Sequence, residues 1–178
     1  MPRIDLEALE ALMTSLNSGD NNEVLAALDI LESSNRSRLI PALILHHPSQ
    51  KVVLRALDVF TSAGREDFIP ITKRLMDHHD PEIRAAVIRA RPSDAIVRAG
   101  LKDKAPLVRG TALVGLVGRT DELGLEAQRL VKELVQKGDT PSRVALARAI
   151  EHQSVFEQLH EGLLLTLGED PDPSVRSA

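Results

Sequence analysis

A thirteen-residue block at positions 78–90, HHDPEIRAAVIRA, recurs in altered copies along the chain and constrains the fold more than any other feature. Asp80 is a typical helix N-cap, and Pro81 falls at the first helical position, where its missing N–H costs nothing. The apolar residues that follow have the spacing of one helical face: Ile83, Ala86 and Val87. Arg84 and Arg89 lie off that face. A chain made of copies of such a block is a repeat protein.

The branched apolar residue of each copy gives the period of the repeat. The equivalent positions are Val24, Val53, Ile83, Val108, Val144 and Val175, and they lie 29, 30, 25, 36 and 31 residues apart. Helix pairs that recur every roughly 30 to 40 residues are typical of α-solenoids. No segment alternates with the period of two that a strand requires. We therefore expect an all-α fold, with five to six helix pairs in a single domain over residues 1–178.

The apolar composition agrees with closely packed helices. Apolar residues make up 43% of the chain, yet there are only three Phe and no Trp or Tyr, so the core is mainly small and aliphatic. The chain has no Cys, which excludes disulfides and thiolate metal sites and is compatible with a reducing compartment. No apolar run approaches the roughly 18 to 20 residues of a membrane span. We expect a cytoplasmic protein that does not itself insert into a membrane.

The net charge of −4 is unevenly distributed along the chain. Residues 1–34 carry a net charge of −6, residues 35–119 one of +7, and residues 120–178 one of −5. A basic middle between acidic ends could be a docking region for an anionic partner. The alternative interpretation, which we favour, is an ordinary solvated surface with local fluctuations in charge.

Three stretches resemble the second helix of HEAT repeats, especially of the short bacterial type: DPEIRAAVIRA, APLVRGTAL and DPSVRSA. The resemblance extends over nearly the whole chain and implies a right-handed superhelix. In that family the arginine after the valine commonly pairs with the turn aspartate of its own or a neighbouring repeat. The resemblance thus implies structural roles for Arg84, Arg109 and Arg176, with Asp80, Asp103 and Asp172 as their partners. Arg55 and Arg143 are off this pattern, which makes a continuous ladder doubtful.

A second resemblance concerns residues 39–71, which look similar to the soluble HEAT segments of bacterial nucleotide-transporter-like membrane proteins. It implies that this chain could be a cytoplasmic regulatory segment of such a protein. The C-terminus supports a related expectation, because Ala178 stops the chain a few residues into a helix opened by Asp172 and Pro173. A helix that short is marginal, and solenoids need capping repeats. We expect the chain to be a fragment of a longer protein.

Neither catalytic nor metal chemistry is predicted. His46-His47 and His78-His79 could together offer four imidazoles to a transition metal, but no carboxylate lies at a ligand spacing. Both pairs lie where a helix C-terminus favours histidine, so we expect no metal and no cofactor. The chain holds one His-Glu dipeptide, His160-Glu161, whereas HEAT-repeat di-iron hydroxylases use four. Nucleic-acid binding is not expected without stacking aromatic side chains or a broadly basic face.

The remaining candidate site is the surface of the second helices. Arginine suits bidentate contact with a carboxylate or phosphate. We expect the arginines outside the valine-arginine pattern to be the freer ones and to contact a protein partner: Arg55, Arg89 and Arg148. The sequence thus favours a non-catalytic protein-binding or scaffolding module that contacts another protein or another domain of the same chain. The alternatives are the regulatory segment described above and an enzyme on a HEAT scaffold.

Overall fold

The computed structural model describes residues 5–90, 93–151, 163 and 165–178, and every regular element in them is a helix. This agrees with the all-α prediction. The chain folds into two compact units, Met1–Asp77 and His78–Ala178, each of which is described by itself. The single domain expected over 1–178 stays a prediction. Among the described residues, no helix combines the length and the apolar character that crossing a membrane requires.

The described part of the first unit, residues 5–77, contains four α-helices and two short 3₁₀ helices. In chain order they are α1 (Leu6–Ser15), α2 (Asn21–Ser33), η1 (Ser37–Leu39), η2 (Ala42–His46), α3 (Gln50–Ser62) and α4 (Ile69–Leu75). The sequence predicts one short helix over residues 39–45, but two 3₁₀ helices occupy this region because Pro41 and Ile40 have extended backbone. Arg65 holds this interruption in place by donating to the carbonyls of Ser37 and Ile40, each at 2.7 Å.

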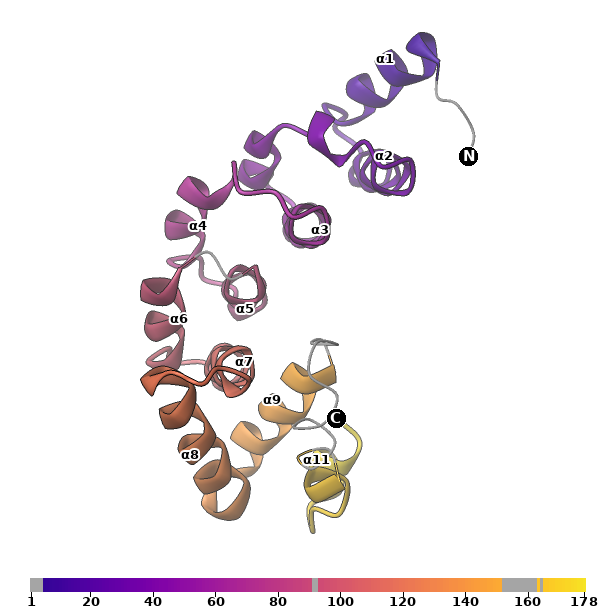
Figure 1. Ribbon diagram of the computed structural model, residues 1–178. Coiled ribbons are helices and arrows are strands. Elements are labelled where there is room, and N and C mark those ends of the chain that lie inside the picture. Colours follow the sequence, from indigo (N-terminus) through magenta and orange to yellow (C-terminus); the bar gives the residue numbers. More distant parts are fainter. Residues whose placement is uncertain (1–4, 91–92, 152–162, 164) are drawn as a thin grey trace. The chain divides into compact units, whose positions relative to one another are not determined.

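The second unit contains six described helices: α5 (Pro81–Arg89), α6 (Asp94–Leu101), α7 (Pro106–Val117), α8 (Glu122–Lys137), α9 (Thr140–Glu151) and α11 (Pro173–Arg176). Helix α7 packs against α5, α6, α8 and α9. Figure 1 shows α5 and α7 nearly end-on in neighbouring positions, with α6 to one side of them. The sequence also predicts a helix over residues 154–168, most of which lie outside the described residues.

Helix α7 is central to the second unit, and its sequence is correspondingly apolar on several sides. Val108, Ala112 and Leu116 are at most 1% exposed, and Leu113, Val114 and Val117 are also buried. Gly110 allows the close approach of α9, because a Cβ there would lie 3.0 Å from the carbonyl oxygen of Ala145. On α5, all six residues from Ile83 to Ile88 are buried, including the guanidinium-bearing Arg84. A buried arginine requires partners, and these define the candidate site.

Candidate functional site

The turns before α2, α3, α5, α7 and α11 share one hydrogen bond. The side chain two residues before the N-cap accepts a hydrogen bond from the N-cap backbone N–H. The acceptors are Ser18, His47, His78, Asp103 and Asp170, at 3.1, 3.1, 3.1, 2.8 and 2.9 Å. Short polar side chains that bind the backbone two residues on favour such turns. We call this residue the turn acceptor.

The second shared feature is an arginine four residues after the N-cap, which we call the clamp arginine. Clamp arginines occur in α5, α7, α9 and α11: Arg84, Arg109, Arg143 and Arg176. In three of them the Nη1 group donates to the two carbonyls that precede the N-cap, at 2.6 to 3.1 Å. Arg143 donates to one of the two, that of Gly138. Each clamp arginine thereby satisfies carbonyl groups of its own turn and fixes the start of its helix.

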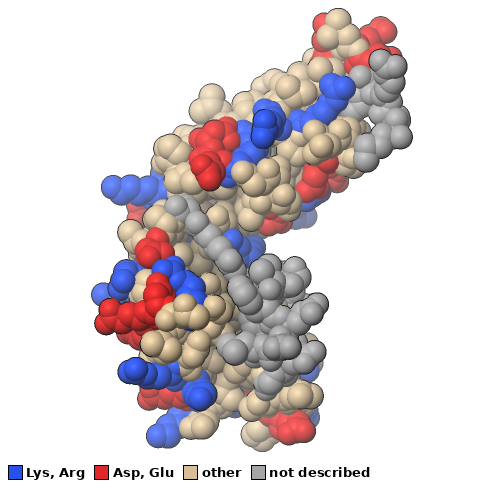
Figure 2. Space-filling model, viewed as in Figure 1, with Lys and Arg blue, Asp and Glu red and all other residues tan. Residues whose placement is uncertain are grey.

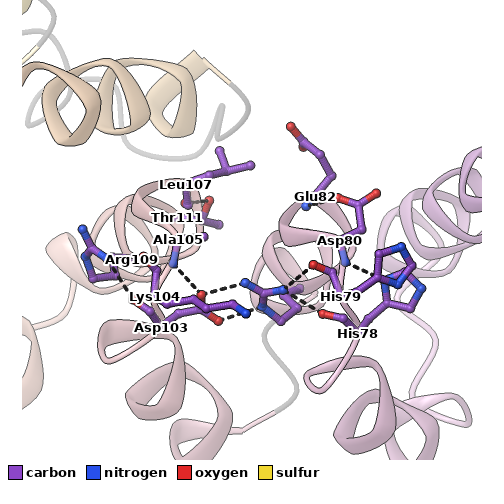
Figure 3. A network of polar contacts seen from close by, with 11 residues as sticks. His78, His79, Asp80, Glu82, Asp103, Lys104, Ala105, Leu107, Arg109 and Thr111 are labelled. Carbon is purple, nitrogen blue, oxygen red and sulfur yellow. Dashed lines mark hydrogen bonds and ion pairs between the residues drawn. The ribbon is translucent and has the colours of Figure 1, made fainter.

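The clamp arginine of α5 also reaches the next turn (Figure 3). Arg84 donates from Nε and Nη2 to the two carboxylate oxygens of Asp103, both at 2.8 Å. Both side chains are largely buried, at 5% and 11% exposed. The Arg84 guanidinium lowers the pKa of Asp103, as does the N–H of Ala105, while burial opposes the shift. Hydrogen bonding to Asp103 in turn raises the pKa of Arg84. We call a clamp arginine paired with the next turn acceptor a rung.

A second rung joins α9 to the turn before α11. The Nε atom of Arg143 lies 2.8 Å from Oδ2 of Asp170, and Nη2 donates to Oδ1 at 3.4 Å. Nε makes no hydrogen bond, so its N–H is not directed at the oxygen and the contact is an ion pair of poorer geometry than that of Arg84. The sequence interpretation missed this rung, since it aligned the repeats on Val144, which Arg143 precedes instead of following. Counting from the N-cap Asp139 places Arg143 on the same position as Arg84.

The other predicted pairs are not formed. Asp80 and Asp172 are helix caps that accept from the N–H groups of Glu82 and Ser174, both at 2.9 Å. Asp172 also accepts from the hydroxyl of Thr140 at 2.9 Å. Neither aspartate makes an ion pair with a clamp arginine among the described residues. A carboxylate at the N-cap position points back at its own helix N-terminus, which leaves the turn acceptor to meet the neighbouring arginine.

Arg109 and Arg176 form no rung with any described residue. Arg109 binds its own turn through Nη1 only, and the position that would supply its carboxylate is Lys137, two residues before the N-cap Asp139. Arg176 also binds only its own turn. Of the arginine–aspartate pairs that the sequence predicts, only Arg84 and Asp103 are therefore connected through their side chains.

The three arginines predicted to contact a partner differ in availability. Arg55 is not free, because it pairs with Asp29 at 2.7 Å and with Glu32, and so ties α3 to α2. Burial lowers the pKa of Arg55, but the two carboxylates outweigh it and leave the pKa raised. Arg89 and Arg148 make no hydrogen bond or ion pair with any described residue. Each lies nine residues after its N-cap, with Arg148 exposed and Arg89 half-buried.

The histidine pairs have local roles. Nδ1 of His47 and of His78 accepts a backbone N–H, and the rings of His78 and His79 stack with centroids 4.3 Å apart. The two pairs belong to different units. Among the described residues, no three His, Cys, Asp or Glu side chains are grouped closely enough to hold a metal ion.

The charged side chains are mixed over the surface visible in Figure 2, where basic and acidic groups alternate with uncharged areas. The pairing explains part of this mixing. The basic middle of the sequence supplies Arg55, whose partners Asp29 and Glu32 belong to the acidic first 34 residues. Arg119 of the same basic region pairs with Asp94 at 2.6 Å and with Asp121. The pairs of Arg55 with Asp29 and Glu32, and of Arg119 with Asp121, neutralise in space charges that are segregated along the sequence.

In comparisons with protein-family models, with curated proteins and with solved structures, nothing matches the chain.

Proposed function

We propose that this chain is a non-catalytic protein-binding or scaffolding module whose helix pairs stack as a right-handed, HEAT-like α-solenoid. One observation carries the proposal: the clamp arginine and its turn recur at the start of α5, α7, α9 and α11. The same local structure at the start of several helices is what a chain of similar repeats produces. At Arg84 and Arg143 it also joins one helix to the next turn, and stacked repeats are stabilised by such contacts with their neighbours. Solenoids of this kind act by displaying an extended surface.

The proposed contact surface on the second unit contains Arg89 of α5 and Arg148 of α9. Both arginines occupy the same position of their helices, and no described carboxylate neutralises either of them. An arginine in this state suits a bidentate contact with a carboxylate. The partner is therefore an acidic segment of another protein or of another domain of the same chain. Arg55 takes no part, because its guanidinium is already paired twice.

The test compares two double charge reversals of the full chain. Arg89→Glu with Arg148→Glu removes the proposed contacts, and Arg98→Glu with Arg129→Glu makes the same change in net charge at exposed positions of α6 and α8. Proteins captured by the wild type in cells that express it are identified, and their dissociation constants are measured by isothermal titration calorimetry. We expect at least about a tenfold loss of affinity in the first variant only.

Two results would contradict the proposal. One is equal binding by the two double variants, which would place the contact elsewhere. The other is turnover of a substrate by the purified chain that is lost on a single polar substitution, which would favour an enzyme on this scaffold.

A further inference from the structure

The turn between α8 and α9 differs from the two turns that complete rungs. Asp103 and Asp170 are turn acceptors with a carboxylate, and each takes the Nε and Nη2 side of the preceding clamp arginine. Before α9 the same position holds Lys137. The Nε and Nη2 groups of Arg109 therefore have no carboxylate among the described residues. Arg109 still binds its own turn at 2.9 and 3.0 Å, so its guanidinium is held in place.

A cavity of about 330 Å³ lies at this incomplete rung. Its polar lining includes Arg109, Lys137 and the backbone of Gly138, the groups around the missing carboxylate. The remaining wall is mostly aliphatic and is supplied by α6, α7 and α8: Leu101, Leu113, Leu130 and Leu134, together with Glu133. This volume is at the lower end of the range of small-molecule sites, which are mostly apolar with a few fixed polar groups.

We propose that this cavity binds an aliphatic carboxylate, whose carboxyl group completes the rung at Arg109. The inference is independent of the protein-binding surface, since it uses neither Arg89 nor Arg148. Arg109 presents the same atoms that bind Asp103 and Asp170 at the other rungs, so a carboxylate from outside the chain can form the same two contacts. The leucines bury the aliphatic part of the ligand.

The charges near the cavity favour a monocarboxylate. Arg109 and Lys137 are cationic, and among the described residues of the cavity lining Glu133 of α8 is the only acidic one. Asp139 lies beyond the lining as the N-cap of α9, where hydrogen bonds from Ser142 lower its pKa and the charges of Arg109 and Arg143 add to the effect. Arg109 and Lys137 together can bind one ligand carboxylate, whereas a second one would face Glu133 and Asp139.

The first test titrates the full chain with octanoate and with 1-octanol, followed by heteronuclear NMR shifts and calorimetry. We expect octanoate to bind at least about tenfold more tightly than octanol, with shifts confined to the residues around the cavity. A peptide that ends in a leucine carboxylate and its C-terminal amide form the second pair of probes. If the peptide acid binds more tightly than octanoate, the natural ligand is the C-terminal carboxylate of a polypeptide. If octanoate binds more tightly, the natural ligand is a free aliphatic acid. Binding of neither acid overturns the proposal, as does equal binding of acid and neutral analogue.

Two variants test the role of the rung itself. Arg109→Gln removes the guanidinium and should weaken octanoate binding at least about tenfold, but it also loosens the turn. Lys137→Asp avoids this problem, because it supplies the missing carboxylate from within the chain, as Asp103 and Asp170 do. We expect this variant to lose octanoate binding while its thermal midpoint rises. Lys132→Asp, at an exposed position of the same helix, is the control with equal charge change and should bind as the wild type does. Octanoate binding to Lys137→Asp at wild-type affinity would overturn the proposal.

Discussion

The turn before α7 and the turn before α9 meet the preceding clamp arginine in opposite ways. The turn before α7 offers Asp103 to the clamp arginine of α5, and the resulting rung is buried, bidentate and complete. The turn after α8 offers Lys137 to the clamp arginine of α7, and a cavity remains there instead. One side-chain position thus decides whether a link between helices is closed within the chain or stays open to a ligand. The backbone arrangement of the clamp arginine is the same in both.

The largest change in stability is expected for Arg84→Ala, which removes the closed rung. The variant leaves Asp103 buried without its cation and removes the Arg84 N–H groups that donate to the carbonyls of His78 and His79. We expect a loss of about 3 to 5 kcal/mol in the free energy of unfolding, measured by urea denaturation of the full chain. Arg98→Ala, at an exposed site on α6, is the control and should change stability by less than about 0.5 kcal/mol. A loss below about 1 kcal/mol for Arg84→Ala would mean that the closed rung is not stronger than a surface pair.

The closed rung also predicts a dependence of stability on pH. Arg84 lowers the pKa of Asp103 in the folded chain, so the stabilisation is present above the ordinary aspartate pKa of about 3.9 and is lost as the pH falls through the lower folded value. Asp103→Asn should cost about 1.5 to 3 kcal/mol near neutral pH. Its difference from the wild type should stay constant above about pH 5 and shrink below about pH 4. A difference that is unchanged down to pH 2 would contradict this account.

The open rung predicts a gain in stability rather than a loss. Lys137→Asp should raise the free energy of unfolding by about 0.5 to 1.5 kcal/mol, because the new carboxylate pairs with a guanidinium that is already held in place. Chemical denaturation without added ligand measures the effect, and Lys132→Asp should show no such gain. An equal change in the free energy of unfolding of both variants would show that the gain comes from the net charge and not from a pair with Arg109.

The smallest loss in the free energy of unfolding is expected for Arg55→Ala in the first unit. Arg55 pairs with Asp29 and Glu32 across α3 and α2, but about a third of its side chain is exposed. We expect a loss of about 1 kcal/mol or less, and the loss should decrease in 1 M salt, where exposed charges are screened. The loss in Arg84→Ala should change little with salt. A salt-independent effect at Arg55 would show that its pairs behave as buried ones.

Much of the helical organisation could be predicted from the sequence, because apolar spacing and caps are local signals. Asp80 and Pro81 do open α5, and Ile83, Ala86 and Val87 are buried as their spacing indicates. The 3₁₀ interruption around Pro41 was not predicted, since the apolar run LIPALIL has helical spacing on both sides of the proline.

The polar links were predicted less well, for a physical reason. The resemblance to HEAT repeats implies Asp80 and Asp172 as partners, whereas an N-cap side chain is already occupied by its own helix. The residue that is free to accept a neighbour's guanidinium lies two positions earlier, and its type varies among Ser, His and Asp. Arg143 was missed because it precedes Val144, the residue used to align its repeat, instead of following it. Arg55 was predicted to be free, since its partners lie on another helix, 23 and 26 residues away, and no local pattern indicates them.

The spacing within the rungs has a consequence for how such a chain can vary over evolution. Arg84 reaches a carboxylate 19 residues further along the chain, while Arg143 reaches one 27 residues further along. The link depends on a turn and an arginine, both of which are counted from an N-cap, and not on the length of the segment between them. Insertions and deletions in that segment can accumulate without breaking the link. Homologues should therefore differ in length mainly between rungs and keep a constant register within each turn.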